Sequence, residues 1–83
     1  MHSIVLSPRA EKDLKKLPPW IQKWITDKLL DYSHADSPLN FAKPLINLPP
    51  STHRFRVGKY RISFYLEHHI VYVERIQPRS EAY

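Results

Sequence analysis

The sequence predicts a single α+β domain with the element order β-α-α-β-β-β, in which a helical hairpin packs on one face of a small, mainly antiparallel, curved sheet. Three observations support this fold class. Between positions 10 and 32, apolar residues recur three or four positions apart, which is the spacing of one helix face. From position 54 onward they alternate with polar residues, as on a half-buried strand. The chain has 83 residues, so all of it, 1–83, fits one domain.

The first part of the chain is expected to form a short strand and a helical hairpin. Residues 3–6 are a short apolar run, which favours a first strand. Ser7 and Pro8 follow, a hydroxyl that can cap free amides and a proline suited to the first turn of a helix. The pair Pro18-Pro19 ends this helix and begins the next, and two helices joined in this way form an antiparallel hairpin.

The second helix, expected over residues 20–32, carries a broad apolar stripe. Trp20 and Trp24 belong to this stripe. They could stack on nucleobases, but their position on the apolar stripe favours a place in the core, so we expect both indoles to be buried. The following segment, 33–51, contains four prolines and is expected to be a connection, with one short element near residues 45–48.

The last part of the chain is expected to be a three-stranded antiparallel meander. Residues 54–57 alternate basic and apolar side chains, and a glycine-lysine turn leads into a second alternating strand over 60–67. A pair of histidines marks the next reversal, before a run of β-branched residues at 70–76. The helices must cover the apolar face of this meander, so its other face is free to carry the chemistry.

Positive charge is concentrated in the first hairpin of this meander. The net charge is +5, and residues 53–61 contain no acid and four cations: Arg54, Arg56, Lys59 and Arg61. By alternation, Arg54, Arg56 and Arg61 share the face away from the helices. Guanidinium groups placed together repel one another unless an anion lies among them, and a phosphodiester has that charge. A basic sheet surface that only confers solubility remains the alternative.

The rest of the composition excludes several classes of site. The chain has no cysteine, which excludes disulfides and thiolate metal sites and is typical of a reducing compartment. No apolar run reaches the roughly 20 residues of a membrane helix, and no signal peptide is evident, so we expect a soluble protein of the cytoplasm. His53, His68 and His69 have no further partner at ligand spacing, so we expect no metal and no other cofactor. A catalytic role for His53 remains a weaker alternative.

Four segments of the chain together resemble the RelE/ParE toxin superfamily. The motifs are an Arg-x-Arg strand with a glycine turn and Tyr-Arg, an apolar strand, a closing Arg-x-x-x-Tyr, and a first-helix pattern Ser-Pro-x-Ala-x-x-Asp-Leu-x-x-Leu. In this sequence they occupy residues 54–62, 70–76, 79–83 and 7–17. Their order and spacing together are fairly specific for the superfamily, and they cover nearly the whole chain.

The resemblance implies the toxin of a bacterial or archaeal type II toxin–antitoxin pair, neutralised by an acidic cognate antitoxin. RelE-like members of the superfamily cut mRNA, usually on the ribosome. ParE-like members inhibit DNA gyrase and cut nothing. The fold implied is the same β-α-α-β-β-β domain that the residue patterns predict.

The resemblance also implies roles for individual residues. Arg54 and Arg56 match the strand residues that hold RNA phosphates. Arg61 matches the residue that stabilises the transition state, and Tyr83 matches the closing tyrosine that helps to activate the attacking ribose hydroxyl. The residues expected to take part in catalysis are therefore Arg56, Arg61, Arg79 and Tyr83. The residues expected to bind nucleic acid are Arg54, Arg56, Lys59 and Arg61.

The chain departs from the family pattern at positions that bear on proton transfer. Pro78 stands where many ribonuclease members carry histidine, Gln77 stands where some carry arginine, and the family's catalytic lysines are arginines here. Arginine stabilises charge but is a poor proton shuttle, because the pKa of its guanidinium lies far above neutral pH. Metal-independent cleavage of mRNA is the leading hypothesis. A ParE-like gyrase inhibitor and a non-catalytic module that binds nucleic acid or antitoxin are the alternatives.

Overall fold

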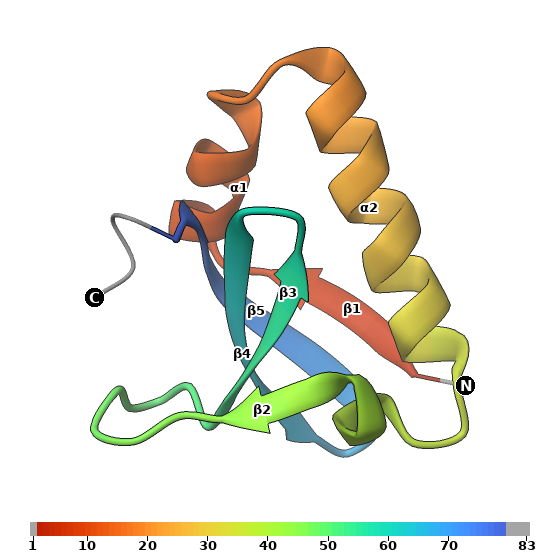
Figure 1. The fold of residues 1–83 in the computed structure, drawn as a ribbon. Coiled ribbons are helices and arrows are strands. Elements are labelled where there is room, and N and C mark those ends of the chain that lie inside the picture. Colours follow the sequence, from red (N-terminus) through yellow and green to blue (C-terminus); the bar gives the residue numbers. More distant parts are fainter. Residues whose placement is uncertain (1, 80–83) are drawn as a thin grey trace.

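The computed structural model describes residues 2–79, which form helices and strands around one sheet (Figure 1). In chain order the elements are β1 (Ser3–Leu6), α1 (Pro8–Lys15), α2 (Pro19–His34), a 3-10 helix η1 (Pro38–Phe41), β2 (Ala42–Pro44), β3 (His53–Val57), β4 (Tyr60–Glu67) and β5 (Ile70–Pro78). The sheet order is β1-β5-β4-β3-β2. The predicted α+β class and the order of the predicted elements are confirmed, and η1 and β2 are added to them.

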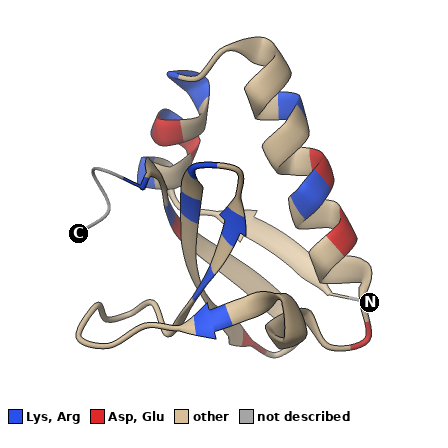
Figure 2. Cartoon of the chain, viewed as in Figure 1, with Lys and Arg blue, Asp and Glu red and all other residues tan. Residues whose placement is uncertain are grey.

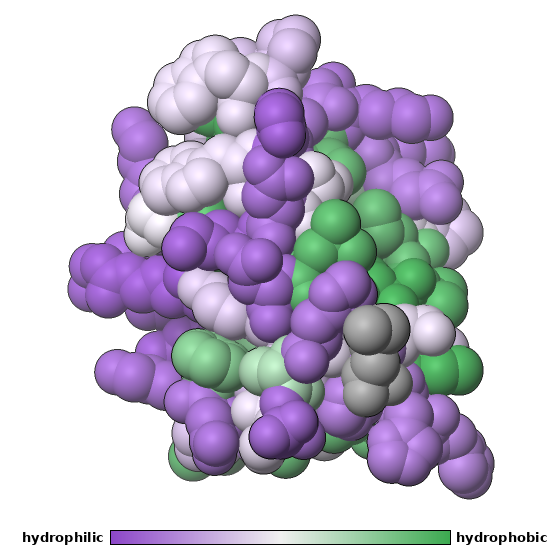
Figure 3. All heavy atoms as spheres, turned by 90° about the vertical axis from the view of Figure 1, so that its right-hand side faces the viewer, coloured by the Kyte–Doolittle hydropathy of each residue, from purple (hydrophilic) through white to green (hydrophobic). Residues whose placement is uncertain are grey.

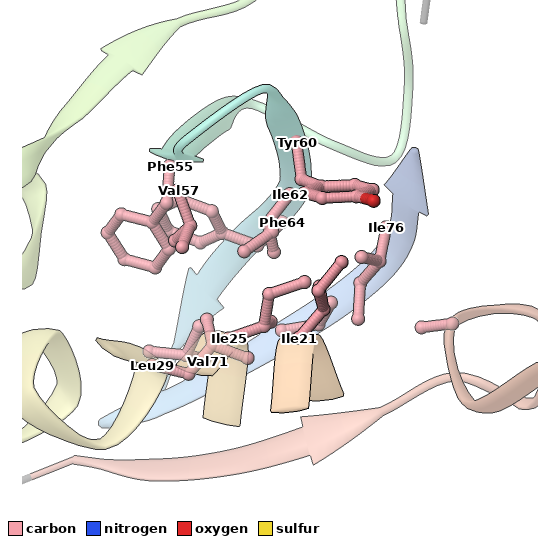
Figure 4. Packing of buried hydrophobic residues seen from close by; sticks show 12 residues of the cluster. Ile21, Ile25, Leu29, Phe55, Val57, Tyr60, Ile62, Phe64, Val71 and Ile76 are labelled. Carbon is pink, nitrogen blue, oxygen red and sulfur yellow. The ribbon is translucent and has the colours of Figure 1, made fainter. Parts of the chain in front are cut away.

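The hydrophobic core lies between α2 and one face of the sheet (Figure 4). On the helix it consists of Ile21, Ile25 and Leu29, each four residues after the last, so that one side of α2 faces the strands. On the sheet Phe55 stacks on Phe64 with ring centroids 4.1 Å apart. The remaining buried side chains come mainly from β3, β4 and β5: Val57, Tyr60, Ile62, Val71, Val73 and Ile76. Because these residues face inward, their neighbours along each strand face the opposite side of the sheet.

The start of α1 is fixed by Ser7, as the sequence predicts. The Ser7 hydroxyl accepts a hydrogen bond from the backbone N–H of Ala10 at 3.0 Å and donates one to the carbonyl of Glu74 at 2.8 Å. The first bond satisfies an N–H group that the helix leaves unpaired, and the second ties the helix to β5. Pro8 then occupies the first turn.

The edge of β5 is covered partly by β1 and partly by α1. β1 pairs in parallel with β5 up to Leu6, which lies opposite Val73, and the other strand pairs are antiparallel. Beyond that point the Asp13 carboxylate accepts hydrogen bonds from the backbone N–H of Ile76 at 3.0 Å and from Arg75 Nε at 2.8 Å. Asp13 therefore supplies a hydrogen-bond acceptor for the Ile76 N–H, a backbone group at the edge of β5 that lies beyond the end of β1.

A bulge in β5 changes which of its residues face the core. Ser63 of β4 lies opposite Arg75, but the next residue, Phe64, lies opposite Val73, so Glu74 is an extra residue. Val73 and Ile76 are consequently both buried although they are three positions apart, which strict alternation would not allow.

The structure contradicts the expected burial of the two tryptophans. Trp20 is 68% exposed and Trp24 is 38% exposed. The buried stripe of α2 runs through Ile21 and Ile25, one position after each tryptophan, and one position turns a side chain by about 100° around the helix. The indoles therefore lie at the border of the stripe. They stack on each other with ring centroids 6.4 Å apart and an interplanar angle of 17°.

The connection between α2 and β3 also differs from the expectation. The short element expected near residues 45–48 is wrong, because the added strand β2 ends before it, at Pro44. Leu45 still donates its backbone N–H to the carbonyl of Thr52 at 2.9 Å, and this bond holds the base of the loop between β2 and β3. β2 was missed because three residues ending in a proline give no strand pattern.

An aliphatic groove lies on the side of the molecule formed by α2 and β1. Its hollow of about 240 Å³ is lined by Ile4, Leu6, Thr26, Leu29 and Leu30. Figure 3 looks onto this side and shows hydrophobic side chains gathered in one patch.

Among residues 2–79, neither helix is long and apolar enough to cross a membrane.

Candidate nucleic-acid interface

The hairpin of β3 and β4 brings the predicted arginines together. Phe55 lies opposite Ile62 in this hairpin, and both are buried against the helices. Arg56 lies directly opposite Arg61, one step closer to the turn, so both of these side chains project from the other face. Arg54 is two residues from Arg56 and shares that face. The geometric prediction that these three guanidinium groups lie on the open side of the sheet is therefore confirmed.

The added strand β2 supplies a fourth cation to this face. Lys43 lies opposite Arg54 in the β2–β3 pair. Together with one aromatic ring, the four cations line a hollow of about 80 Å³, whose residues are Phe41, Lys43, Arg54, Arg56 and Arg61. A hollow of this size holds one small group, such as a phosphate, since a water molecule occupies about 30 Å³. We call it the basic hollow. Sequence reasoning missed Lys43 because β2 was not predicted, and its one local signal was the alternation of Ala42 with Lys43.

The electrostatics of the basic hollow favour an anion. Among residues 2–79, the ion pairs join Lys23 to Asp27, His68 to Glu67 and Arg75 to Asp13, and none of them involves Lys43, Arg54 or Arg56. Arg56 has a long hydrogen bond, 3.4 Å from its Nε to the carbonyl of Gly58. Figure 2 shows basic residues along β2, β3 and the start of β4, with no acidic residue on β2, β3 or the turn. Like charges placed this closely repel, and a bound phosphate would relieve that repulsion.

A second hollow continues along the same face of the sheet. It measures about 200 Å³ and is lined by Arg9, Ser63, Glu74, Arg75, Gln77 and residues 48–51. It adjoins the basic hollow, because Ser63 lies opposite Arg54 and Gln77 lies opposite Arg61. Its lining includes both basic and acidic side chains, and it offers room for a group larger than a phosphate beside the four cations.

Arg75 in this second hollow is held by Asp13. Burial by itself raises the pKa of Asp13, but the hydrogen bonds from Arg75 and from the Ile76 N–H, together with the charges of Arg75 and Lys16, outweigh it and lower the pKa below its usual value. The same hydrogen bond raises the pKa of Arg75. The pair therefore stays ionised, and Arg75 is fixed in place as part of the wall.

Two further predicted residues lie at the hairpin turn. Lys59 is exposed in the turn between β3 and β4. Its carbonyl accepts a hydrogen bond from the backbone N–H of Arg79 at 2.7 Å, so Arg79, also exposed, lies beside the turn. Neither residue lines the basic hollow. Tyr83, the predicted activating tyrosine, lies outside the described residues.

The histidines are placed away from the basic hollow. His53 lies opposite Phe64, with ring centroids 6.0 Å apart, and therefore on the face of β3 that Arg54 does not share. His68 and His69 are exposed in the turn between β4 and β5. Within residues 2–79, no three His, Asp or Glu side chains are grouped so that they could hold a metal ion.

A tyrosine pair occupies the far end of the open face. Tyr65 and Tyr72 lie opposite each other with ring centroids 4.8 Å apart. Burial raises the pKa of Tyr65 above its usual value, and the negative charges of Glu74 and Glu67 add to this effect. Tyr65 is therefore neutral near pH 7, and the open face runs from a cationic end to an acidic, aromatic end.

Comparison with known proteins gives one family. A family model described as "ParE toxin of type II toxin-antitoxin system, parDE" matches residues 4–83. The comparison with curated proteins finds no match.

Solved structures share the fold over nearly their whole length. The RelBE2 toxin–antitoxin complex of Mycobacterium tuberculosis has a chain that is 28% identical, with a TM-score of 0.71 over 94% of this chain and 98% of that one. The archaeal RelE–RelB complex of Pyrococcus horikoshii gives 17% identity and a TM-score of 0.75 over 98% of both chains. The intact RelBE complex of Escherichia coli gives 16% identity and a TM-score of 0.72 over 94% and 96%. With the family model matching residues 4–83, the chain belongs to the ParE toxin family of type II toxin–antitoxin systems, within the RelE/ParE superfamily.

Proposed function

We propose that the protein is a RelE-like endoribonuclease that cuts ribosome-bound mRNA in the cytoplasm, without a metal ion or other cofactor. The observation that carries this proposal is the basic hollow, where Lys43, Arg54, Arg56 and Arg61 surround a space that suits one phosphate. The second hollow beside it leaves room for a nucleotide next to that phosphate. The M. tuberculosis RelBE2 chain, the neighbour with 28% identity, adds support from the RelE side of the superfamily.

The proposed reaction is a transesterification within the RNA. The 2′-oxygen of a ribose attacks the adjacent phosphorus, the bond from phosphorus to the 5′-oxygen breaks, and the products carry a 2′,3′-cyclic phosphate and a 5′-hydroxyl. A base removes the proton of the 2′-hydroxyl, and the leaving 5′-oxygen takes up a proton. We assign the activation of the 2′-hydroxyl to Tyr83, the residue that matches the closing tyrosine of the superfamily.

The cations of the basic hollow would act through charge. Arg61, Arg54 and Arg56 face the position of the phosphate, where negative charge grows as the new bond forms. One donor of this kind contributes on the order of 3 kcal/mol to lowering the barrier. Arginine keeps its proton at any pH near neutrality, so these residues bind and stabilise while the proton transfers fall to other groups. Lys59 and Arg79, at the turn, would contact phosphates on either side of the cut.

The proposed protein partner is an acidic cognate antitoxin. The neighbours from M. tuberculosis and E. coli come from toxin–antitoxin complexes, as their descriptions state. The net charge of +5 on this chain favours association with an acidic partner. An antitoxin that covered the basic hollow would block the phosphate site directly.

Inhibition of DNA gyrase without any cleavage is the second candidate. Two observations favour it: the matching family model is that of the ParE toxins, and Pro78 occupies a position where many ribonuclease members of the superfamily carry histidine. Among the described residues, the basic hollow contains cations and no acid–base pair. A gyrase inhibitor needs no such pair.

Expression of the chain in bacteria separates the candidates. Primer extension on cellular mRNA and supercoiling of a reporter plasmid are followed in the same culture. Under the proposal, mRNA acquires site-specific cuts, and Arg61→Ala reduces them by about 100-fold. The matched control is Lys28→Ala, which removes one exposed cation from α2 and should leave the cuts intact. Relaxed plasmid with intact mRNA would establish the gyrase inhibitor instead. Normal growth without either effect would leave a non-catalytic binding module.

A further inference from the structure

A pair of exposed aromatic side chains, Trp20 and Trp24, lies on the surface of α2. Trp20 is 68% exposed and Trp24 is 38% exposed, and their rings stack nearly parallel. Large apolar rings on a surface cost solvation free energy, and exposed tryptophans are enriched where a protein binds something. The pair does not belong to the basic hollow, and nothing in the function proposed so far uses it.

The tryptophan pair is fixed against the turn of the basic hairpin. Gly58 in that turn has a φ of +58°, and a Cβ at this position would come within 2.5 Å of Cη2 of Trp24 and 2.9 Å of its Cζ3. The indole of Trp24 therefore lies directly on the glycine backbone. Because this contact immobilises Trp24, and Trp24 in turn stacks on Trp20, the two rings present a preformed surface.

The neighbours of this aromatic surface along the turn are cationic. Arg56 donates its Nε to the carbonyl of Gly58, Lys59 is the next residue, and the backbone of Arg79 is hydrogen-bonded to that of Lys59. The one acid near the pair on α2, Asp27, is already bound to Lys23 at 2.9 Å. Within residues 2–79, these three cations take part in no ion pair. Aromatic rings set among cations are the combination that single-stranded nucleic acids bind, with bases on the rings and phosphates at the cations.

We propose that Trp20 and Trp24 form a base-stacking surface for single-stranded RNA that extends past the hairpin turn from the basic hollow. This inference rests on the proposed function, because it gives the same RNA a second contact. A second exposed apolar surface, the groove that Ile4, Leu6 and Leu30 help to line, offers a contrast. It is aliphatic and no cation lines it, so it lacks both features that a nucleotide requires.

The chain provides its own probe for this proposal, since Trp20 and Trp24 are its only two tryptophans. The intact chain is titrated at low ionic strength with a single-stranded oligoribonucleotide, made resistant to cleavage by 2′-O-methylation. A second oligonucleotide has the same number of phosphates but no bases. Stacking of a base on an indole quenches its fluorescence, so the base-bearing strand should quench strongly and the abasic strand weakly.

Substitutions separate stacking from charge. Trp20→Ala removes a largely exposed ring, so it should leave the fold intact, and it should weaken binding of the base-bearing strand by about 5- to 100-fold. Binding of the abasic strand should not change. The matched control is Leu30→Ala, which removes another exposed apolar side chain from α2 and should change neither affinity. Fluorescence anisotropy of labelled strands measures the affinities where the intrinsic signal is lost.

The possible outcomes distinguish this inference from the proposed function. Arg54→Ala could weaken the binding of both oligonucleotides while Trp20→Ala weakens the binding of neither. In that case the proposed stacking surface is wrong, and the RNA site in the basic hollow stands. Equal affinity of the unmodified chain for both strands would also overturn the stacking surface. If neither strand binds, both proposals fail. If Trp20→Ala abolishes toxicity but leaves RNA binding unchanged, the aromatic surface contacts a protein instead of RNA.

Discussion

Arg56 and Arg61 lie directly opposite each other across the β3–β4 hairpin, on the face of the sheet that the helices do not cover. Direct cross-strand neighbours have Cβ atoms about 5 Å apart, so two guanidinium groups at this position repel each other. This repulsion between Arg56 and Arg61 lowers the free energy of unfolding. Because a chain of 83 residues has a small core, its free energy of unfolding is already limited. Functional sites in many proteins show the same trade between stability and binding.

The first prediction concerns that repulsion. Arg56→Gln should raise the free energy of unfolding by up to about 1 kcal/mol in the absence of any anion, which corresponds to a rise in Tm of up to about 4–8 °C. The same substitution should weaken RNA binding. Thermal melts followed by circular dichroism measure the stability. Lys12→Gln, which removes an exposed cation from α1, should leave Tm nearly unchanged, and a lower Tm for Arg56→Gln would contradict the prediction.

The second prediction tests the contribution of Lys43, which only the structure placed in the basic hollow. If Lys43 contacts a phosphate, Lys43→Ala should reduce the slope of log Kd against log salt by about 0.7 for a single-stranded RNA. Binding titrations at several salt concentrations measure this slope. Lys28→Ala serves as the control with the same change in net charge. An unchanged slope in Lys43→Ala would place this lysine outside the RNA contact.

The third prediction concerns the pH dependence of stability through Asp13. The folded pKa of Asp13 lies below its usual value of 3.8, so its ionised form stabilises the fold above that pH. As the pH falls below about 3.8 and through the folded pKa, this contribution is lost. Asp13→Ala should lower the free energy of unfolding by about 1–3 kcal/mol at pH 7, because it leaves Arg75 and the Ile76 N–H without their acceptor.

Melting curves across the acid range test this third prediction. The difference in Tm between the unmodified chain and Asp13→Ala should be largest near neutral pH and should shrink as the pH falls below about 3.8. Asp31→Ala changes an exposed position of α2, so the difference in Tm between this variant and the unmodified chain should not shrink as the pH falls. A difference in Tm that does not depend on pH would mean that the Asp13 charge contributes nothing.

The fourth prediction concerns the contact between Gly58 and Trp24. Gly58→Ala should destabilise the fold by more than the roughly 1 kcal/mol that a positive φ costs an alanine, because its Cβ would also displace the Trp24 ring. In a Trp24→Ala background the same substitution should cost only the backbone part. A double-mutant cycle on the free energy of unfolding measures the difference. A coupling energy of zero would show that the ring does not rest on the glycine.

The sequence by itself determined the elements that depend on local patterns. Alternation along β3 and β4 placed Arg54, Arg56 and Arg61 on one face, because a strand turns every second side chain to the same side whatever it pairs with. The cap at Ser7 and the turn at Gly58 were equally local, since each depends on the backbone conformation of a few consecutive residues. These features gave the fold class and most of the basic hollow.

Only the tertiary structure decided what depends on contacts between distant segments. Lys43 joins the basic hollow because β2 pairs with β3, and Asp13 pairs the edge of β5 because α1 follows β1 there. Trp20 lies at the surface because the sheet contacts α2 along Ile21 and Ile25, and a broad apolar stripe does not reveal which part of it meets the strands. In each case the position of the residue is set by packing or hydrogen bonding with a segment that is remote in sequence. A pattern among neighbouring residues therefore does not reveal it.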